Sequence, residues 1–170
     1  MKISNKFAIG CLVQWYEIEI VEEYIKSLKQ AISNIENKEN VIVDFTLTTN
    51  QELEKIDKTQ IDMKSIEKTF KSMMNEGWCF KITSELVTIA DYRRWFNDYY
   101  CDDVDVMMWG ETDSLIPKQT FQILDNLHNG VKDKTPKYTT FFSTCKMWDD
   151  SWKVLEHPEF TDNPFYDNQL

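Results

Sequence analysis

The stretch Phe7-Ala-Ile-Gly-Cys-Leu-Val13 decides the fold of this chain, because it is short and apolar without a break. Such a run is typical of a strand that is covered on both faces, as in a parallel sheet. An amphipathic helix is predicted next, since apolar residues recur at steps of three and four from Ile18 to Ile32. Val41-Ile-Val-Asp-Phe45 is the second strand-like run, so the chain opens with a βαβ unit and its right-handed crossover.

The same alternation continues along the chain. A helix is predicted from Met63 to Met73, with Gly77 placed to end it, and a strand follows at residues 78–82. A helix over residues 88–100 with Thr88 as its cap precedes a strand at 104–109. Pro117 in a first turn opens the last helix, which extends to Gly130 before a fifth strand at 138–142. Residues 46–58 are predicted to form a loop and residues 146–170 irregular structure on the core.

These elements predict an α/β fold with a mostly parallel, Rossmann-like central sheet flanked by helices. The 170 residues fit one domain, residues 1–170. A hydrophobic fraction of 42%, with 14% aromatic residues, indicates a packed globular protein, since a disordered chain lacks the apolar surface that offsets ordering entropy.

Charge and hydropathy narrow the classes of partner. Asp and Glu number 29 against 19 Lys and Arg, and the net charge of -10 should repel nucleic acid. A nucleotide remains compatible, because one bound cation can invert the local potential. The first apolar run is too short for a signal peptide or a membrane span, and the four cysteines are widely spaced, as free thiols are. We therefore expect a cytoplasmic protein without a membrane span.

The carboxyl ends of the predicted strands are where ligands bind in parallel sheets. Trp109-Gly-Glu-Thr-Asp113 follows the fourth predicted strand, and Glu111 and Asp113 can point the same way if the chain stays extended. Carboxylate and water oxygens favour Mg²⁺ or Mn²⁺, which would bridge the phosphates of a nucleotide diphosphate. The alternative is that both carboxylates merely cap the helix entered through Pro117.

Three stretches resemble the nucleotide-sugar-binding part of GT-A glycosyltransferases. Residues 11–17 and the helix 22–28 look like the opening strand, turn and helix of these enzymes, and residues 90–97 are similar to the helix before their metal motif. Residues 104–117 resemble the strand that ends in the Asp-x-Asp motif of the family, written here Glu111-Thr112-Asp113. The resemblance covers most of residues 7–160. Glu111 departs from the usual Asp, which frees it to reach the sugar or ribose, whereas Asp113 is the expected metal ligand.

The resemblance implies transfer of a sugar from a nucleotide-diphosphate donor, a UDP-sugar, to an unidentified acceptor hydroxyl with Mn²⁺ or Mg²⁺. It places Gln14, Tyr16 and Glu17 beside the nucleoside and Glu111 and Thr112 beside the donor. It also makes His157 a second metal ligand, and Asp149 or Asp150 the base if the reaction inverts the anomeric carbon.

Two further groups of residues are candidates for the nucleotide site. Thr46, Thr48 and Asn50, expected just beyond the second strand, could hydrogen-bond the base, and the alternative is a polar loop that touches nothing. Asp91, Arg93 and Arg94 lie on one predicted helix, where an arginine could fork onto phosphate or a ribose-bound carboxylate. The alternative there is an Asp91–Arg94 ion pair on the helix surface.

Two other functions stay open. The chain stops soon after the fifth predicted strand, which favours either a shortened or minimal enzyme or a nucleotide-sugar-binding module without transfer activity. A nucleotidyltransferase uses the same kind of sheet and acidic metal site, but a Gly-rich phosphate loop is missing near Gly10.

Overall fold

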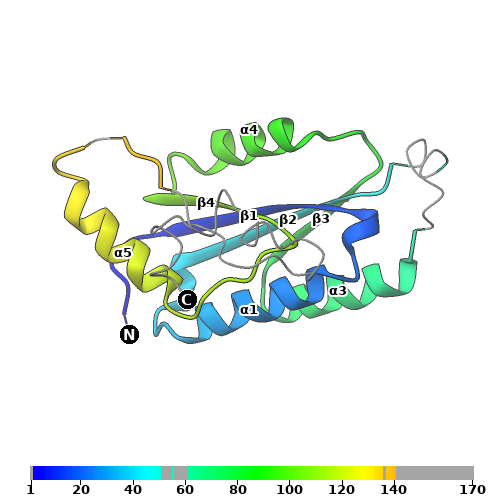
Figure 1. Cartoon of the computed structure of the whole chain (residues 1–170), viewed down its shortest axis with the longest axis horizontal. Coiled ribbons are helices and arrows are strands. Elements are labelled where there is room, and N and C mark those ends of the chain that lie inside the picture. Colours follow the sequence, from blue (N-terminus) through cyan, green and yellow to red (C-terminus); the bar gives the residue numbers. More distant parts are fainter. Residues whose placement is uncertain (1, 51–54, 56–60, 136, 141–170) are drawn as a thin grey trace, which may run out of the picture.

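A computed structural model describes residues 2–50, 55, 61–135 and 137–140 of the chain. Each of the main elements falls within these residues (Figure 1). The strands are β1 (Phe7–Gln14), β2 (Val41–Thr48), β3 (Cys79–Thr83) and β4 (Val106–Gly110). The helices are α1 (Val21–Ser33), α3 (Met63–Asn75), α4 (Ile89–Tyr100) and α5 (Thr120–Val131), and the short 3-10 turns are η1 (Trp15–Glu17) and η2 (Lys38–Asn40).

The strands form one four-stranded sheet in the order β3-β2-β1-β4, and every pairing in it is parallel. The register runs in step along β1 and β2, from Phe7 opposite Val41 to Gln14 opposite Thr48. On the other side of β1, β4 pairs only as far as Cys11 opposite Gly110. The predicted α/β fold with a parallel, Rossmann-like sheet is therefore confirmed.

The two faces of the sheet are covered differently (Figure 1). Helices α1, α3 and α5 supply the larger core together with Phe7, Ile9 and Cys11 of β1, which project to that side. The intervening residues of β1, Ala8 and Leu12, pack against α4 on the other face. Because successive side chains of a strand alternate between faces, the unbroken apolar run of β1 supplies both cores at once.

Two predicted helix ends, at Gly77 and Thr88, are confirmed. Gly77 has φ +71°, the left-handed conformation that lets the chain turn after α3 at no steric cost. The Thr88 side chain accepts a hydrogen bond from the Asp91 backbone N–H at 3.1 Å, as a cap of α4 should. The carboxylate of Asp62 caps α3 in the same way.

Other predicted boundaries were wrong. Strand β2 continues through Thr46 to Thr48, because threonine is β-branched and favours a strand even in a polar stretch. Pro117 precedes α5 instead of forming its first turn. Residues 138–140 of the expected fifth strand are not a strand, and residues 141–142 lie outside the described part, as does the segment 146–170.

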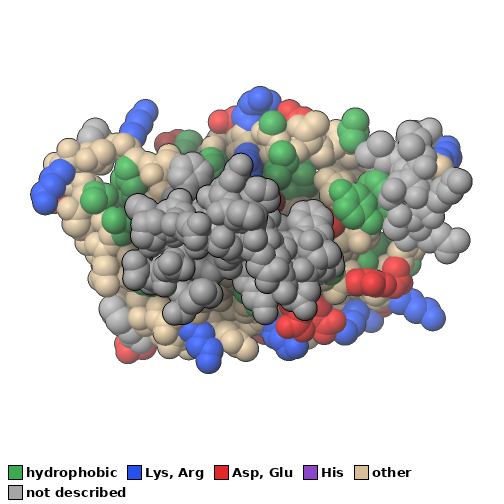
Figure 2. All heavy atoms as spheres, viewed as in Figure 1, with side chains coloured by type: hydrophobic (Ala, Val, Ile, Leu, Met, Phe, Trp, Pro, Cys, Tyr) green, Lys and Arg blue, Asp and Glu red, His purple; other side chains and the backbone are tan. Residues whose placement is uncertain are grey.

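The described residues include no helix that is long and apolar enough to cross a membrane. Figure 2 shows lysine and arginine side chains spread around the outline of the visible face, with acidic side chains among them.

Candidate functional site

The strand order reverses between β1 and β4, and the crevice in which open α/β sheets bind ligands is therefore expected beyond the carboxyl ends of these two strands. From β1 the chain moves outward to β2 and β3, and it then returns to the other side of β1 for β4. The connections after β1 and β4 therefore leave in different directions, and ligands of open α/β sheets bind in the gap that results. The residues that follow these two strands are therefore the candidates for a binding site.

Glu17 closes the turn that follows β1. Its Oε2 accepts a hydrogen bond from the Gln14 backbone N–H at 2.9 Å, and the Thr48 hydroxyl donates to Gln14 Oε1 at 2.7 Å. Gln14 and Glu17, which were predicted to bind the nucleotide, thus lie at the carboxyl ends of the strands, and Thr48 lies beside them. Tyr16 is 53% exposed and packs edge to face on the buried Trp15, with ring centroids 5.2 Å apart.

Negative charge accumulates at the end of β1. Burial raises the pKa of Glu17, and the nearby charges of Asp113 and Glu111 raise it further, whereas hydrogen bonds from Gln14 and Thr112 act in the opposite direction. Burial and these carboxylates also raise the pKa of the Cys11 thiol. The turn after β1 and the turn after β4 are therefore close enough to interact electrostatically, and a cation placed between them would be stabilised.

Helix α4 contributes one arginine to this crevice. The Arg93 guanidinium forms an ion pair with Glu111 and lies over the Trp109 ring, with 5.3 Å between its carbon and the ring centroid. Trp109 Nε1 donates to Asn97 Oδ1 at 3.2 Å, one helical turn further along α4. This side of α4 is therefore attached to the end of β4.

Arg94 does not contact that crevice in the same way. It forms an ion pair with Asp91 at 3.1 Å, one turn earlier on the exposed surface of α4, as expected for a surface pair without a ligand role. The Asp91 carboxylate also receives the Thr88 hydroxyl at 2.6 Å. Asp91 and Arg94 therefore have structural partners, and Arg93 is the arginine that the fold brings to Glu111.

Two of the predicted base-binding residues were misplaced. Thr46 and Thr48 lie inside β2 and are buried, with 5% and 2% of their surface exposed. Thr46 lines a cavity under α4, away from the crevice. Asn50 follows the strand, and its Nδ2 donates to the Ser84 carbonyl at 3.5 Å, which links the ends of β2 and β3.

Tyr24 of α1 is a residue of this edge that sequence reasoning missed. It is fully buried, and a Cβ on Gly110 would lie 1.7 Å from its Oη. Gly110 therefore lets the backbone pass over the tyrosine just before the acidic turn. The position of Gly110 between an apolar strand and two carboxylates could have indicated a close backbone contact. It could not have identified Tyr24 as the residue contacted.

Two described carboxylates, those of Asp113 and Glu17, are candidates to contribute to a cation site that a diphosphate would complete. Asp113 is exposed, whereas Glu111 already pairs with Arg93. No group of three or more His, Cys, Asp or Glu side chains that could hold a metal occurs within the described ranges. Mg²⁺ is usually held by one or two carboxylates plus substrate phosphates. Asp113 and the nearby Glu17 would supply these carboxylates.

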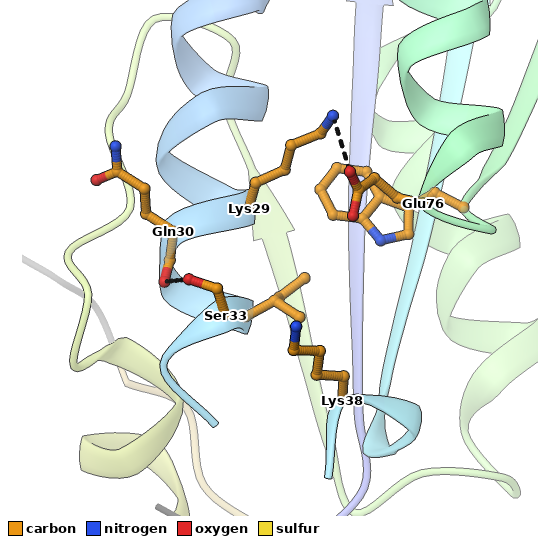
Figure 3. Close-up of a pocket in the computed structure, with 7 residues that line it drawn as sticks. Lys29, Gln30, Ser33, Lys38 and Glu76 are labelled. Carbon is orange, nitrogen blue, oxygen red and sulfur yellow. Dashed lines mark hydrogen bonds and ion pairs between the residues drawn. The ribbon is translucent and has the colours of Figure 1, made fainter. Parts of the chain in front are cut away.

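Predicted residues near the carboxyl terminus fall outside the described part of the chain. They are the candidate bases Asp149 and Asp150 and the candidate metal ligand His157. A separate hollow of about 270 Å³ lies where α1 and α3 end (Figure 3), and no predicted site residue lines it. Lys29 and Glu76 pair across this hollow at 3.1 Å.

Neither a protein-family profile, nor a curated protein, nor a solved structure matches this chain. The choice of function therefore depends on the geometry of the crevice between β1 and β4.

Proposed function

We propose that the crevice between β1 and β4 binds a nucleotide-diphosphate sugar together with Mn²⁺ or Mg²⁺, and that the chain transfers the sugar to an acceptor hydroxyl. The observation that supports this proposal is the position of Glu17, Glu111 and Asp113 on the turns that follow β1 and β4, where the charges of Asp113 and Glu111 reach Glu17. Carboxylates gathered in this way repel an anion, so a phosphorylated ligand needs a cation between itself and the protein.

The side chains of the crevice have separate parts in this proposal. Asp113, exposed after β4, would hold the cation, whose chemistry is to neutralise charge on the departing diphosphate. Arg93 would fork onto a phosphate or the sugar, since its guanidinium is held between Glu111 and the Trp109 ring. Glu17 fixes the turn after β1, where backbone groups would face the nucleoside.

Replacement of Asp113 by Ala tests the metal site directly. We expect the affinity for UDP in the presence of Mn²⁺, measured by isothermal titration calorimetry, to fall by about tenfold or more. Asp133→Ala removes an exposed aspartate beyond α5 and is the matched control. Equal affinity of the two variants, or affinity for UDP that does not depend on Mn²⁺, would contradict the role of Asp113.

Turnover separates the three candidate functions. Slow Mn²⁺-dependent release of free sugar from a panel of UDP-sugars supports a transferase, because water can replace the acceptor. Binding of UDP-sugar without release supports a binding module. Reaction of UTP with a sugar phosphate to give diphosphate supports a nucleotidyltransferase.

A further inference from the structure

Strand β3 is an outer strand of the sheet, and its free edge carries unpaired backbone groups. The strand order ends at β3, which pairs with β2 alone. The Thr83 carbonyl accepts a hydrogen bond from the Thr49 backbone N–H at 2.8 Å, so the backbone groups of Thr83 face β2. Because the facing direction alternates along a strand, the N–H and C=O groups of Phe80 and Ile82 point away from the sheet. Within the described part of the chain, no backbone group pairs with them.

Exposed apolar side chains lie next to this free edge on the α3 side of the sheet. Phe70 of α3 packs edge to face on Phe80, with ring centroids 5.8 Å apart. Met74, one turn further along α3 and on the same side of the helix, is 54% exposed. Ile82 shares a face of β3 with Phe80 and is 51% exposed. An apolar strip beside an unpaired strand edge is typical of a surface that another chain covers.

Lys81 is the charged side chain of β3, and a lysine on an edge strand usually prevents pairing with another chain. Here its ammonium pairs with Asp44 of β2 at 3.0 Å and lies 5.6 Å from the centroid of the Tyr99 ring of α4. Lys81 is therefore drawn over the α4 face of the sheet, and a buried carboxylate balances its charge. The edge of β3 stays open to a further strand.

A second copy of this chain fits the edge because the arrangement is self-complementary. In an antiparallel pair with a twofold axis at Lys81, Phe80 of each copy lies opposite Ile82 of the other. Both outward-facing residues of each copy then form backbone hydrogen bonds. The same axis brings the two α3 helices together in antiparallel directions, since Phe70 packs on Phe80. The two apolar strips then bury each other, which favours association.

The charges that border the strip are complementary in this pairing. Glu67 and Lys71 form an exposed ion pair on α3 within one chain. In antiparallel helices, Lys71 of one copy approaches Glu67 of the other, so opposite charges meet across the joint. The two Lys81 ammonium groups repel each other at the axis, and the Asp44 carboxylate that each keeps offsets this repulsion. The net charge of -10 opposes association only at long range, where salt screens it.

We propose that this chain forms a dimer with a second copy of itself through β3, so that the two four-stranded sheets join into one continuous sheet. The two α3 helices pack on each other through Phe70 and Met74, with Ile82 beside them. The strand order places β3 at the opposite edge of the sheet from β4. The dimer therefore leaves the crevice between β1 and β4 open, and it does not depend on the proposed function.

Analytical ultracentrifugation of the full chain measures the association directly. At about 100 μM we expect mostly dimer, with a Kd in the micromolar range. Ile82→Lys places a charge in the joint and should raise the Kd by about tenfold or more. Met107→Lys places the same charge on β4, the other outer strand, at a side chain that is 37% exposed, and should leave the dimer intact. Circular dichroism checks that both variants are folded.

A disulfide tests the register of the two strands. An axis at Lys81 places residue 83 of one copy opposite Cys79 of the other, at a non-hydrogen-bonded position where Cα atoms are about 4.5 Å apart and a disulfide can form. Thr83→Cys should therefore give a covalent dimer on mild oxidation, seen by non-reducing electrophoresis, and adding Cys79→Ser should abolish it. A monomer at about 100 μM, a dimer that Met107→Lys disrupts and Ile82→Lys does not, or no cross-link with Thr83→Cys would overturn the proposal.

Discussion

The two edges of the sheet use their carboxylates in opposite ways. At the amino edge, Asp125 of α5 accepts hydrogen bonds from the backbone N–H groups of Ser4 and Asn5 at 2.9 and 2.8 Å, and from Asn5 Nδ2 at 2.7 Å. At the carboxyl edge, burial raises the pKa of Glu17, and the nearby charges of Asp113 and Glu111 raise it further.

This difference separates groups that hold the fold from groups that can bind a ligand. Hydrogen bonds from Asn5 and Ser4 lower the pKa of Asp125 although burial acts against them, so its ionised form stabilises the native state. Burial, and after it the charges of Asp113 and Glu111, raise the pKa of Glu17 and so disfavour its ionised form in the native state. A site where like charges gather costs stability, and a cation would relieve that cost.

Removal of the Asp125 carboxylate should cause the largest loss in the free energy of unfolding. Asp125→Ala leaves the backbone N–H of Asn5, a residue only 4% exposed, without its acceptor and removes the shortest hydrogen bond of the Asn5 side-chain amide. We expect a loss of about 3 kcal/mol in the free energy of unfolding. Urea denaturation followed by circular dichroism measures it. Asp113→Ala at the other edge should change stability by less than about 0.5 kcal/mol. Similar losses in the two variants would erase the contrast between the edges.

Gly110→Ala, which adds a methyl group, should cause the next largest loss in the free energy of unfolding. The added Cβ would meet Tyr24 Oη at 1.7 Å, and overpacking of this kind costs about 2 kcal/mol. Thermal and urea denaturation of Gly110→Ala would show this loss, and Tyr24→Phe should recover part of it because the phenol oxygen is removed.

Gly130 provides the matched control for this substitution. A Cβ there meets nothing within 4 Å, and Gly130→Ala should stabilise α5 by about 0.5–1 kcal/mol. If Gly110→Ala proved as harmless as Gly130→Ala, the carboxyl edge would be less tightly packed beneath its acidic turn than the structure shows.

Local patterns in the sequence predicted most of the fold. Apolar runs and steps of three and four place strands and helices because they report which side chains one element buries. The end of β2 escaped this reasoning, since Thr46 and Thr48 are polar by composition but buried in a strand. The burial of Asp44 was equally hidden, because its partners Tyr100 and Lys81 come from other elements.

The candidate site was predictable in position but not in its contacts. The strand-end rule placed Glu111 and Asp113 at the carboxyl edge. Arg93 and Arg94 are adjacent in sequence, yet they point about 100° apart on a helix, so only the docking of α4 against β4 selects Arg93. The contact of Gly110 with Tyr24 joins residues far apart in the chain, and no local pattern encodes it.

The pH dependence of stability gives the smallest effect and the sharpest test of the comparison, because its sign should differ between the edges. The pKa of Asp125 is lowered in the folded state, so its contribution is complete above the unfolded pKa of about 3.9 and is lost as pH falls through the folded pKa. The stability that Asp125→Asn loses relative to the unaltered chain should therefore be greater at neutral pH than in acid.

Glu17 should behave in the reverse way. Its pKa is raised in the folded state, so protonated Glu17 stabilises the native state below the unfolded pKa of about 4.3, and this contribution is lost as pH rises through the folded pKa. Relative to the unaltered chain, Glu17→Gln should thus gain stability from acid to neutral pH. Urea midpoints of both variants across this range measure the two slopes. Slopes of the same sign would mean that Glu17, like Asp125, is a carboxylate that the native state prefers to keep ionised.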